Sequence, residues 1–310
     1  MAELSGSCFC CNFPGMLDTV AGLRTKAEAD VILAEPVGSC TDLSATVVQP
    51  LKDRMGRELV ISPLSVLVDP ARLRDILDGG TAGLHASSAY IFRKQLEEAD
   101  IVVVSKADSI SSSDLSVLQE RLAKTCPAAK VLALSALTGA GLKEWLDMVT
   151  TSSDAGQHLA EVDYDIYAEG EAVLGWLNAT ITANGEPTEW KAFASNLLAE
   201  LSRRFDGMGA AVGHIKLIIE TKDDCVIGNL TGKGDTLSVR GPSVTTPGAR
   251  LTLNARVQMS PEALDAGVRD ILARTAGQKV TLTPVAWRCL SPGRPNPTHR
   301  YDYVAAVRSE

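Results

Sequence analysis

Four short apolar runs in the first 150 residues constrain the fold of this chain more than any other feature. Each run is rich in Val, Ile and Leu and is too short for a helix, as buried parallel strands usually are. The runs occupy residues 29–35, 59–69, 99–105 and 130–135. Helical patterns lie at residues 71–77 after Pro70, at 87–99 and at 113–124. This alternation predicts a doubly wound, mostly parallel α/β sheet for residues 1–150.

One further helix is predicted between the first two runs. Ser39 and Asp42 have the spacing of a capping box before an apolar stretch, although Asp replaces the usual Glu or Gln. We expect this helix to end near Pro50, because proline cannot continue the hydrogen-bond pattern of a helix interior.

The second half of the chain has a different rhythm, which begins after a polar stretch at residues 150–156, our candidate linker. The expected strands are 172–183, 214–221, 224–230, 249–259 and 279–287, and the expected helices are 188–204 and 260–276. Pro284 indicates that the last strand is a sheet edge. We therefore expect residues 151–310 to form a smaller α+β domain, an antiparallel sheet with two helices on one face, available to a client or partner.

The charge and hydropathy of the chain exclude two classes of partner. The net charge is −8 over 310 residues and no cluster of Lys and Arg is evident, which argues against a nucleic-acid surface. No apolar run approaches the roughly 20 residues that span a bilayer, and the first residues lack the pattern of a signal peptide. We expect a cytoplasmic protein that binds neither nucleic acid nor membrane; its oligomeric state is left open, including a homo-oligomer.

Three of the seven cysteines fall within four residues, as Cys8, Cys10 and Cys11. A loop can turn all three sulfurs of a C-x-C-C sequence to one side, where they suit a soft ion such as Zn²⁺ or Cu(I). A zinc site needs a fourth ligand, for which Glu3, a water molecule or a second protomer are candidates. The alternative is a run of reduced cysteines that binds no metal.

Two strand ends carry residues suited to a nucleotide. Glu35 ends the first run and Gly38 follows it, so the carboxylate could hold Mg²⁺ while the glycine lets a backbone N–H approach a γ-phosphate. Asp108, after the third run, could accept both N–H groups of a guanine edge, and the stem of Lys106 could stack on the base. The alternatives are an ordinary Glu-Pro turn and a solvated Lys beside a helix-capping Asp.

A further motif follows the last run of the α/β half. Ser135-Ala136 begins a glycine-containing loop whose backbone could close over the base that Asp108 reads. Taken in order, the motifs resemble those of the CobW-type family of cobalamin-synthesis-like GTPases, relatives of the urease and hydrogenase nickel-insertion GTPases. The resemblance implies a GTP-binding metallochaperone or cofactor-insertion protein that uses Mg²⁺ and delivers zinc or another soft divalent metal to a client protein.

The resemblance extends to individual positions. The cysteine motif, with Gly6 nearby, is similar to the family's metal motif, and the segment that begins at Glu35 is similar to its E-x-x-G, on the Mg²⁺ and γ-phosphate side. Ser135-Ala136 is similar to its guanine-side loop. Ser105 stands where the family's N-K-x-D motif has Asn, which removes an amide that braces the base site.

The sequence contains no G-x-x-x-x-G-K-[ST] loop, which binds the phosphates in this family. Family members begin with a strand, this loop and a first switch segment before the cysteines, whereas Cys8 lies seven residues after Met1. We favour a start inside a longer reading frame. The alternative is a metal-binding or partner-docking module that has lost nucleotide hydrolysis, so whether this chain is an enzyme is left open.

The remaining cysteines have plainer interpretations. The segment from Glu35 to Leu43 resembles a branch of the family associated with corrinoid and methyltransferase systems, which implies a link to cobalamin and a corrinoid protein or metalloenzyme as client. Within it, Cys40 could relay the metal or nucleotide state or simply be a small residue at a helix start. Cys289 and His299 flank a proline-rich segment, for which a braced tail is favoured over a second ligand pair. Cys126 and Cys225 are expected to be ordinary core or surface residues.

Overall fold

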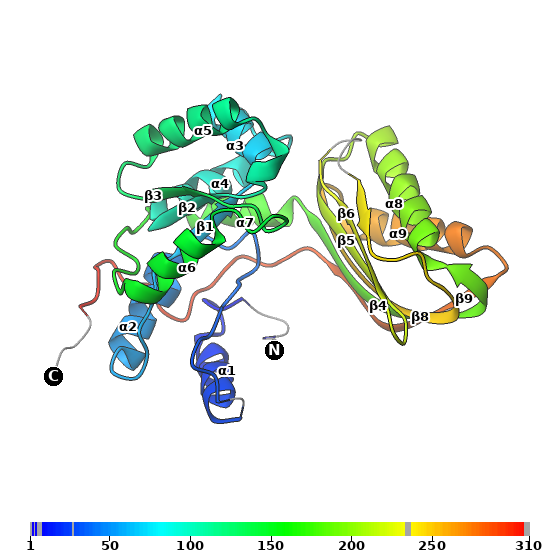
Figure 1. The fold of residues 1–310 in the computed structure, drawn as a ribbon, viewed down its shortest axis with the longest axis horizontal. Helices are drawn as coiled ribbons and strands as arrows, with labels where there is room; N and C mark the ends of the chain where they lie inside the picture. The colour runs from blue at the N-terminus through cyan, green and yellow to red at the C-terminus, as the bar shows by residue number, and fades with distance from the viewer. Residues whose placement is uncertain (1, 3, 5–7, 27, 233–236, 307–310) are drawn as a thin grey trace. The chain divides into compact units, whose positions relative to one another are not determined.

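The computed structural model describes the chain except for residues 1, 3, 5–7, 27, 233–236 and 307–310. The chain forms two compact units (Figure 1). The first unit comprises Met1–Ala82, Ala86–Tyr167 and Arg294–Glu310, and the second comprises Gly83–His85 and Ala168–Gly293. The C-terminal segment therefore belongs to the first unit, and the candidate linker at residues 150–156 lies inside that unit.

A parallel sheet forms the core of the first unit. In the described residues its strands are β1 (Ser65–Val68), β2 (Ile101–Val104) and β3 (Lys130–Ala133), in the order β1-β2-β3. Both strand pairs are parallel and in regular register. All four residues of β2 are buried, because this middle strand is covered on both faces.

Helices cover both faces of this sheet. The helices around it are α3 (Pro70–Leu77), α4 (Ala86–Glu98), α5 (Ser112–Thr125) and α6 (Leu142–Thr151). Side chains of α3, α4 and α5 pack on one face, together with Val102 and Val104. Trp145 and Met148 of α6 pack on the other face, and Figure 1 shows α6 across the sheet from α3 and α5. The predicted doubly wound α/β arrangement is confirmed.

The strand predicted at residues 29–35 is wrong. This segment has no regular secondary structure, and the side chains of Val31 and Leu33 are 68% and 78% exposed. An extended segment becomes a strand only where a neighbour completes its hydrogen bonds. In the described part of the chain, β1 to β3 pair only with one another, and Leu67 on the edge strand β1 is 60% exposed. The sheet therefore has an apolar edge that no described strand covers.

The helix expected to end near Pro50 continues past it. A π-helical turn, η1 (Ser44–Val48), leads directly into α2 (Gln49–Met55). Proline has no N–H to donate to the preceding turn, and the wider turn accommodates it without ending the helix. An additional helix, α1 (Phe13–Lys26), follows the clustered cysteines and was not predicted.

The second unit is an antiparallel sheet with two helices. Its strands are β4 (Gly175–Glu189), β5 (Val212–Glu220), β6 (Cys225–Leu230), β7 (Ser238–Arg240), β8 (Thr245–Val257) and β9 (Val280–Leu290), in the order β7-β6-β5-β8-β4-β9. The helices are α8 (Trp190–Gly207) and α9 (Pro261–Ala276), which lie on the same face of the sheet (Figure 1). A further helix, α7 (Tyr164–Ala172), spans the boundary between the units.

The layout of the second unit agrees with the sequence pattern. Its strands alternate buried and exposed residues, and the buried ones form one core with the apolar sides of α8 and α9. β9 is an edge strand, as Pro284 indicated, and the register shifts beside its partner Ile181. Among the described residues, no helix is both long enough and apolar enough to cross a bilayer.

Candidate metal centre

The three clustered cysteines lie in a tight turn that leads into α1. The N–H of Asn12 donates to the carbonyl oxygen of Cys8 at 3.0 Å. The side chain of Asn12 caps the helix, since its Oδ1 accepts the N–H of Gly15 at 3.1 Å. The thiols therefore stand immediately before a helix N-terminus, where unpaired N–H groups favour negative charge.

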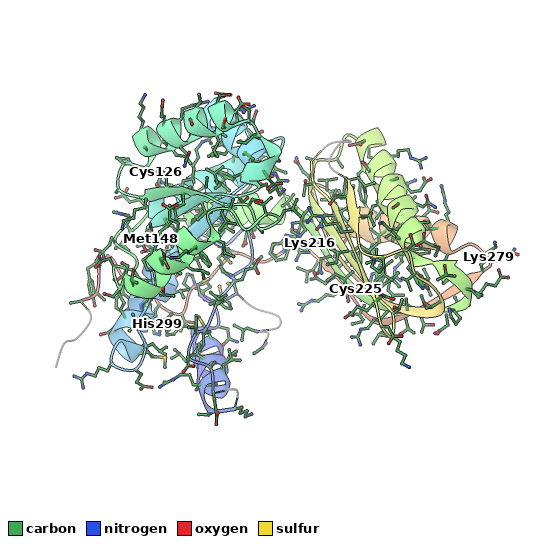
Figure 2. The ribbon with its side chains drawn as sticks, viewed as in Figure 1. Cys126, Met148, Lys216, Cys225, Lys279 and His299 are labelled. Carbon is green, nitrogen blue, oxygen red and sulfur yellow. The ribbon has the colours of Figure 1, made fainter. Side chains whose placement is uncertain are left out.

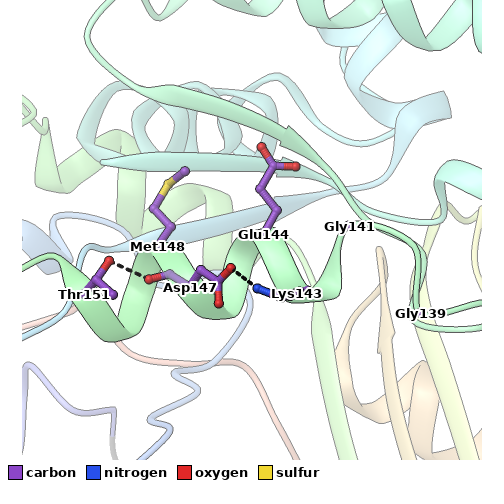
Figure 3. Close-up of a pocket in the computed structure, with 7 residues that line it drawn as sticks. All are labelled: Gly139, Gly141, Lys143, Glu144, Asp147, Met148 and Thr151. Carbon is purple, nitrogen blue, oxygen red and sulfur yellow. Dashed lines mark hydrogen bonds and ion pairs between the residues drawn. The ribbon is translucent and has the colours of Figure 1, made fainter.

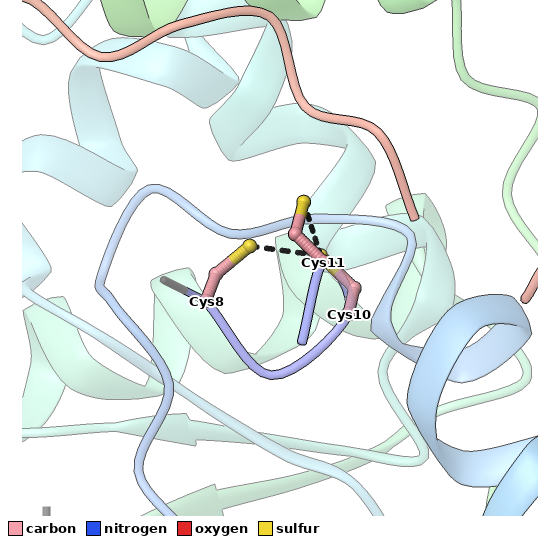
Figure 4. A group of neighbouring side chains, drawn as sticks. All are labelled: Cys8, Cys10 and Cys11. Carbon is pink, nitrogen blue, oxygen red and sulfur yellow. Dashed lines mark hydrogen bonds between the residues drawn. The ribbon is translucent and has the colours of Figure 1, made fainter. Parts of the chain in front are cut away.

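The sulfur atoms of this turn converge (Figure 4). The Sγ atoms of Cys8 and Cys10 are 3.1 Å apart, and those of Cys10 and Cys11 are 3.7 Å apart. All three lie within 4.8 Å of one another. Cys10 is buried, whereas Cys8 and Cys11 are partly exposed, so an ion could reach the cluster from solvent. Convergent thiols of this kind fit a soft metal ion such as Zn²⁺.

The clustered thiols differ in pKa. Hydrogen bonding, chiefly with Cys10, lowers the pKa of Cys8. The hydrogen bond to Cys8, together with burial, raises the pKa of Cys10. Burial raises the pKa of Cys11. Of the three, Cys8 is the thiol that loses its proton most readily to an incoming metal ion.

The C-terminal tail, residues 294–305, returns to the cysteine turn. The N–H of Asn296 donates to Sγ of Cys11 at 3.3 Å. Thr298 donates its N–H to the carbonyl oxygen of Cys10 at 2.8 Å and its hydroxyl to that of Cys11 at 3.2 Å. An N–H donated to sulfur stabilises negative charge there. The sequence carried no signal for this contact, because it joins residues near opposite ends of the chain.

An ion pair anchors the same tail. Nε of Arg300 and the hydroxyl of Tyr164 both donate to Oδ2 of Asp42 at 2.7 Å. The Asp42 side chain is fully buried, so these donors compensate for the loss of water around its carboxylate. The ring of His299 packs edge-on against Phe13, with centroids 5.4 Å apart. The tail is thus attached both at the cysteine turn and at the start of η1.

A buried carboxyl on α4 organises the start of η1. Glu98 is 1% exposed, and its oxygens accept the hydroxyl of Thr41 at 3.0 Å and the N–H of Ser44 at 2.8 Å. The N–H of Asp42 also donates to it. Burial raises the pKa of Glu98 to about 8. Sequence reasoning missed this residue, because an acidic position late in a helix usually faces solvent.

We expect the free energy of unfolding to decrease as the pH rises from about 4.5 to about 8. The pKa of Glu98 is higher in the folded protein than its usual value of 4.5, so folding takes up a proton across this range. The contribution of Glu98 to the stability of the folded protein is complete below pH 4.5 and is lost as the pH rises through 8. The slope reaches at most about 1.4 kcal/mol per pH unit. In urea unfolding, Glu98→Gln should reduce the dependence of the free energy of unfolding on pH between about 4.5 and 8. An unchanged slope would show that other groups cause it.

Lys106 and Asp108 lie directly after β2. Nζ of Lys106 donates to Oδ2 of Asp69, at the end of β1, at 2.8 Å. Asp108 is exposed in a short 3-10 turn, η2 (Ala107–Ser109), where its carboxylate is accessible to a ligand. Hydrogen bonding to Lys106 helps to keep the pKa of Asp69 below its usual range despite partial burial, so Asp69 offers a carboxylate that sequence reasoning missed.

The Ser135-Ala136 loop lies beside this turn. The N–H of Ala107 donates to the carbonyl oxygen of Leu134 at 3.1 Å, which joins the two loops. Ser135 is buried and its Oγ accepts the N–H of Thr138 at 3.1 Å, while Ala136 is exposed. The loops therefore meet at the carboxyl ends of neighbouring parallel strands, where α/β sheets bind their ligands.

Glu35 and Gly38 lie in the irregular segment before η1. Both are exposed, and the carbonyl oxygen of Gly38 accepts Nε2 of Gln95 from α4 at 3.0 Å. Their assignment to Mg²⁺ and phosphate stays a prediction. Glu3, a candidate fourth ligand, and Gly6 lie outside the described residues.

The other cysteines have their own surroundings. Cys126 is buried at the end of α5, and Cys225 is exposed at the start of β6 (Figure 2). Cys289 belongs to the second unit, where its thiol donates to the carbonyl oxygen of Pro261 at 3.1 Å. His299 belongs to the first unit, so each residue of this pair contacts its own unit.

An open hollow of about 680 Å³ runs along α6 (Figure 3). It is lined by Gly139, Gly141, Lys143, Glu144, Asp147, Met148 and Thr151. Lys143 and Asp147 pair with each other across one helical turn. The lining includes none of the site residues predicted from the sequence, and we assign it no role.

The comparisons with known proteins find a family model that matches the first part of the chain. Residues 1–133 match the nucleotide-binding domain of the CobW/HypB/UreG family. The Zn(II)-bound YjiA GTPase from E. coli is 12% identical, with 83% of this chain and 76% of that chain covered and a TM-score of 0.25. A Zn(II)-bound triple mutant of YjiA is also 12% identical, with 85% and 76% covered and a TM-score of 0.26. No curated protein matches the chain.

Proposed function

We propose that this protein is a GTP-binding metal carrier of the metallochaperone type, because residues 1–133 match the CobW/HypB/UreG family of nucleotide-binding domains. The observation that carries the proposal is the convergence of Cys8, Cys10 and Cys11 within 4.8 Å in the family-matched part of the chain. The ion held there is cargo, which the protein passes to a client.

The thiol cluster supports the metal half of this function. Its three sulfurs lie close enough to share one ion; Cys8, whose pKa is lowered, provides the first ligand, and Cys10 and Cys11 add further sulfurs as they lose their protons. Thiolates select soft ions over Mg²⁺ and Ca²⁺, so we propose Zn²⁺ as the cargo. The partly exposed sulfurs of Cys8 and Cys11 leave a route by which a client's ligands could take over the ion.

The joined loops after β2 and β3 support the nucleotide half. We assign Asp108 to the guanine edge and Lys106 to the face of the base, with Ser135 and Ala136 closing the loop beside them. Glu35 is assigned to Mg²⁺. A Mg²⁺ ion bound to GTP would then connect the nucleotide to the segment that precedes η1.

We expect Asp108→Ala to weaken GTP binding about 10- to 100-fold, since it removes a charged acceptor for two guanine donors. The affinity for ATP should not change, because adenine presents no matching pair of donors. Equilibrium titration with both nucleotides measures the ratio of the GTP affinity to the ATP affinity. Asp147→Ala, an exposed carboxylate on α6, is the matched control. An unchanged GTP-to-ATP ratio in Asp108→Ala would contradict the assignment.

Coupling between the two halves is the direct test of the proposed function. GTP with Mg²⁺ should change the Zn²⁺ affinity by about 5- to 150-fold, the usual range for linked sites. Competition against a fluorescent zinc chelator, with and without GTP and Mg²⁺, measures this difference. Equal zinc affinities under the two conditions would contradict a nucleotide-dependent carrier.

A second candidate function is a metal-binding or partner-docking module that does not hydrolyse nucleotide. The observation that favours it is the lack of a G-x-x-x-x-G-K-[ST] loop in the sequence. In this version the second unit docks a client, and a corrinoid protein or other metalloenzyme is the client we propose. Measurable GTP turnover by this chain would exclude the non-hydrolysing version.

A further inference from the structure

We propose that Cys40 is the fourth ligand of the metal, so that the carrier holds its cargo on four sulfur atoms supplied by one chain. The inference rests on the proposed metal-carrying function and adds a ligand from a different segment. Cys40 lies in the E-P-V-G-S-C sequence, two residues after Gly38 and outside the C-x-C-C motif.

Cys40 shares its surroundings with the other three cysteines. It is 2% exposed and belongs to the same packed cluster as Cys10, against which Cys8 and Cys11 also lie. The side chains of Cys40 and Cys8 hydrogen-bond to each other. The sulfur of Cys8 therefore has cysteine neighbours from two segments, its own turn and the segment before η1.

The spacing of the sulfurs suits a tetrahedral ion. Four sulfurs about 2.3 Å from a tetrahedral zinc ion stand about 3.8 Å from one another. The Cys8–Cys10 and Cys10–Cys11 distances are 3.1 Å and 3.7 Å, so an ion at their centre needs only small adjustments. Three sulfurs complete one face of a tetrahedron. The sulfurs that all lie within 4.8 Å of one another are those of Cys8, Cys10 and Cys11, so Cys40, which contacts Cys8, must move closer to the other two to supply the remaining corner.

The backbone around Cys40 is held in place from two directions. Its N–H donates to the carbonyl oxygen of Val37 at 2.8 Å, which closes a turn. Nε2 of Gln95 donates to the carbonyl oxygens of Gly38 and Cys40, at 3.0 Å and 2.8 Å. Glu98, one turn further along α4, accepts a hydrogen bond from the hydroxyl of Thr41, the residue after Cys40. A buried ligand on a fixed backbone has little freedom to lose when a metal binds.

The structure favours Cys40 over the other candidates for the fourth position. Burial of Cys10 and Cys40 leaves little access for water on that side of the cluster. His299, a candidate from the C-terminal tail, packs its ring against Phe13. Cys40 needs no second protomer, and its sulfur is as soft as the other three.

A ligand at this position connects the metal to the nucleotide segment. Gly38, assigned to the γ-phosphate, and Cys40 are separated by a single residue and share Gln95 as a donor. A shift of the Gly38 backbone would move the sulfur of Cys40 with it. Removal of one of four ligands by such a shift would lower the metal affinity, which is what release to a client requires.

Zinc K-edge X-ray absorption of the zinc-loaded full chain tests the proposal without any substitution. We expect four sulfur ligands at about 2.3 Å. Three sulfurs with one nitrogen or oxygen would overturn the role of Cys40 and leave the metal-carrying function intact. A wild-type chain that binds no zinc would instead overturn the proposed function itself, so the two failures are distinguishable.

Substitution of single cysteines provides a second test of the proposal. Cys40→Ser should lower the zinc affinity at least about 100-fold, beyond the roughly 10- to 100-fold that loss of an outer partner costs. Cys11→Ser should have an effect of similar size. Cys126→Ser, at a buried cysteine outside the cluster, is the matched control and should bind zinc as the wild type does. A Cys40→Ser protein with an unchanged circular dichroism spectrum and wild-type zinc affinity would contradict the proposal.

Discussion

Replacement of Cys10 by Ser is expected to lower the zinc affinity by about 100- to 1000-fold. Structural zinc sites bind with about 10–16 kcal/mol in total, so each of four ligands contributes about 3–4 kcal/mol. Cys10 lies between its two neighbours, at 3.1 Å from the sulfur of Cys8 and 3.7 Å from that of Cys11. A hydroxyl at this position is a poor ligand for a soft ion.

The loss in Cys10→Ser is measured by competition with a chelator of known zinc affinity. Cys126→Ser, which changes a buried thiol against the parallel sheet, controls for the loss of a cysteine as such. The wild-type affinity should also increase with pH, because zinc must displace protons from thiols whose pKa is raised. Equal zinc affinities in wild type and Cys10→Ser would show that the cluster binds no metal.

Replacement of Glu98 by Ala is expected to lower the free energy of unfolding by about 3 kcal/mol. The substitution leaves the hydroxyl of Thr41 and the N–H groups of Asp42 and Ser44 buried without their acceptor. Each such group costs about 1–3 kcal/mol, and relaxation of the segment recovers part of the sum. Urea unfolding at pH 7, followed by circular dichroism, measures the change.

Glu97→Ala is the matched control for this experiment. Glu97 is the adjacent residue of α4 and pairs at the surface with Lys94, an interaction worth about 0–1 kcal/mol. If both variants lost the same small amount of stability, Glu98 would not organise the start of η1. A second consequence follows from position: Glu98 holds the residue after Cys40, so Glu98→Ala should also weaken zinc binding.

The local sequence predicted most elements of the fold. The Ile101–Val104 run is apolar throughout and forms the buried middle strand, and Pro70 opens α3 as a first-position proline does. Period-two alternation likewise located the long strands of the second unit. The segment at 29–35 has the same composition as a strand but failed to form one, because a strand also depends on a neighbour that composition does not reveal.

The candidate site was predictable only in part. The C-x-C-C spacing indicated convergent thiols, since residues so close in sequence share one turn. The contacts of the C-terminal tail with the cysteine turn and with Asp42 were not predictable, because they join distant segments and follow no periodic pattern. They are made by Asn296, Thr298 and Arg300. Likewise, Cys40 is a single cysteine in the sequence, and only its packing beside Cys8 suggests a ligand.

Metal analysis of the full chain, isolated without chelators and then titrated with Zn²⁺ at neutral pH, tests the central claim most directly. We predict one tightly bound zinc ion per chain, lost in a variant in which Cys8, Cys10 and Cys11 are all replaced by Ser. A chain that contains no zinc and takes up no more of it than the triple variant would contradict a metal site at the cysteine cluster, and with it the carrier function.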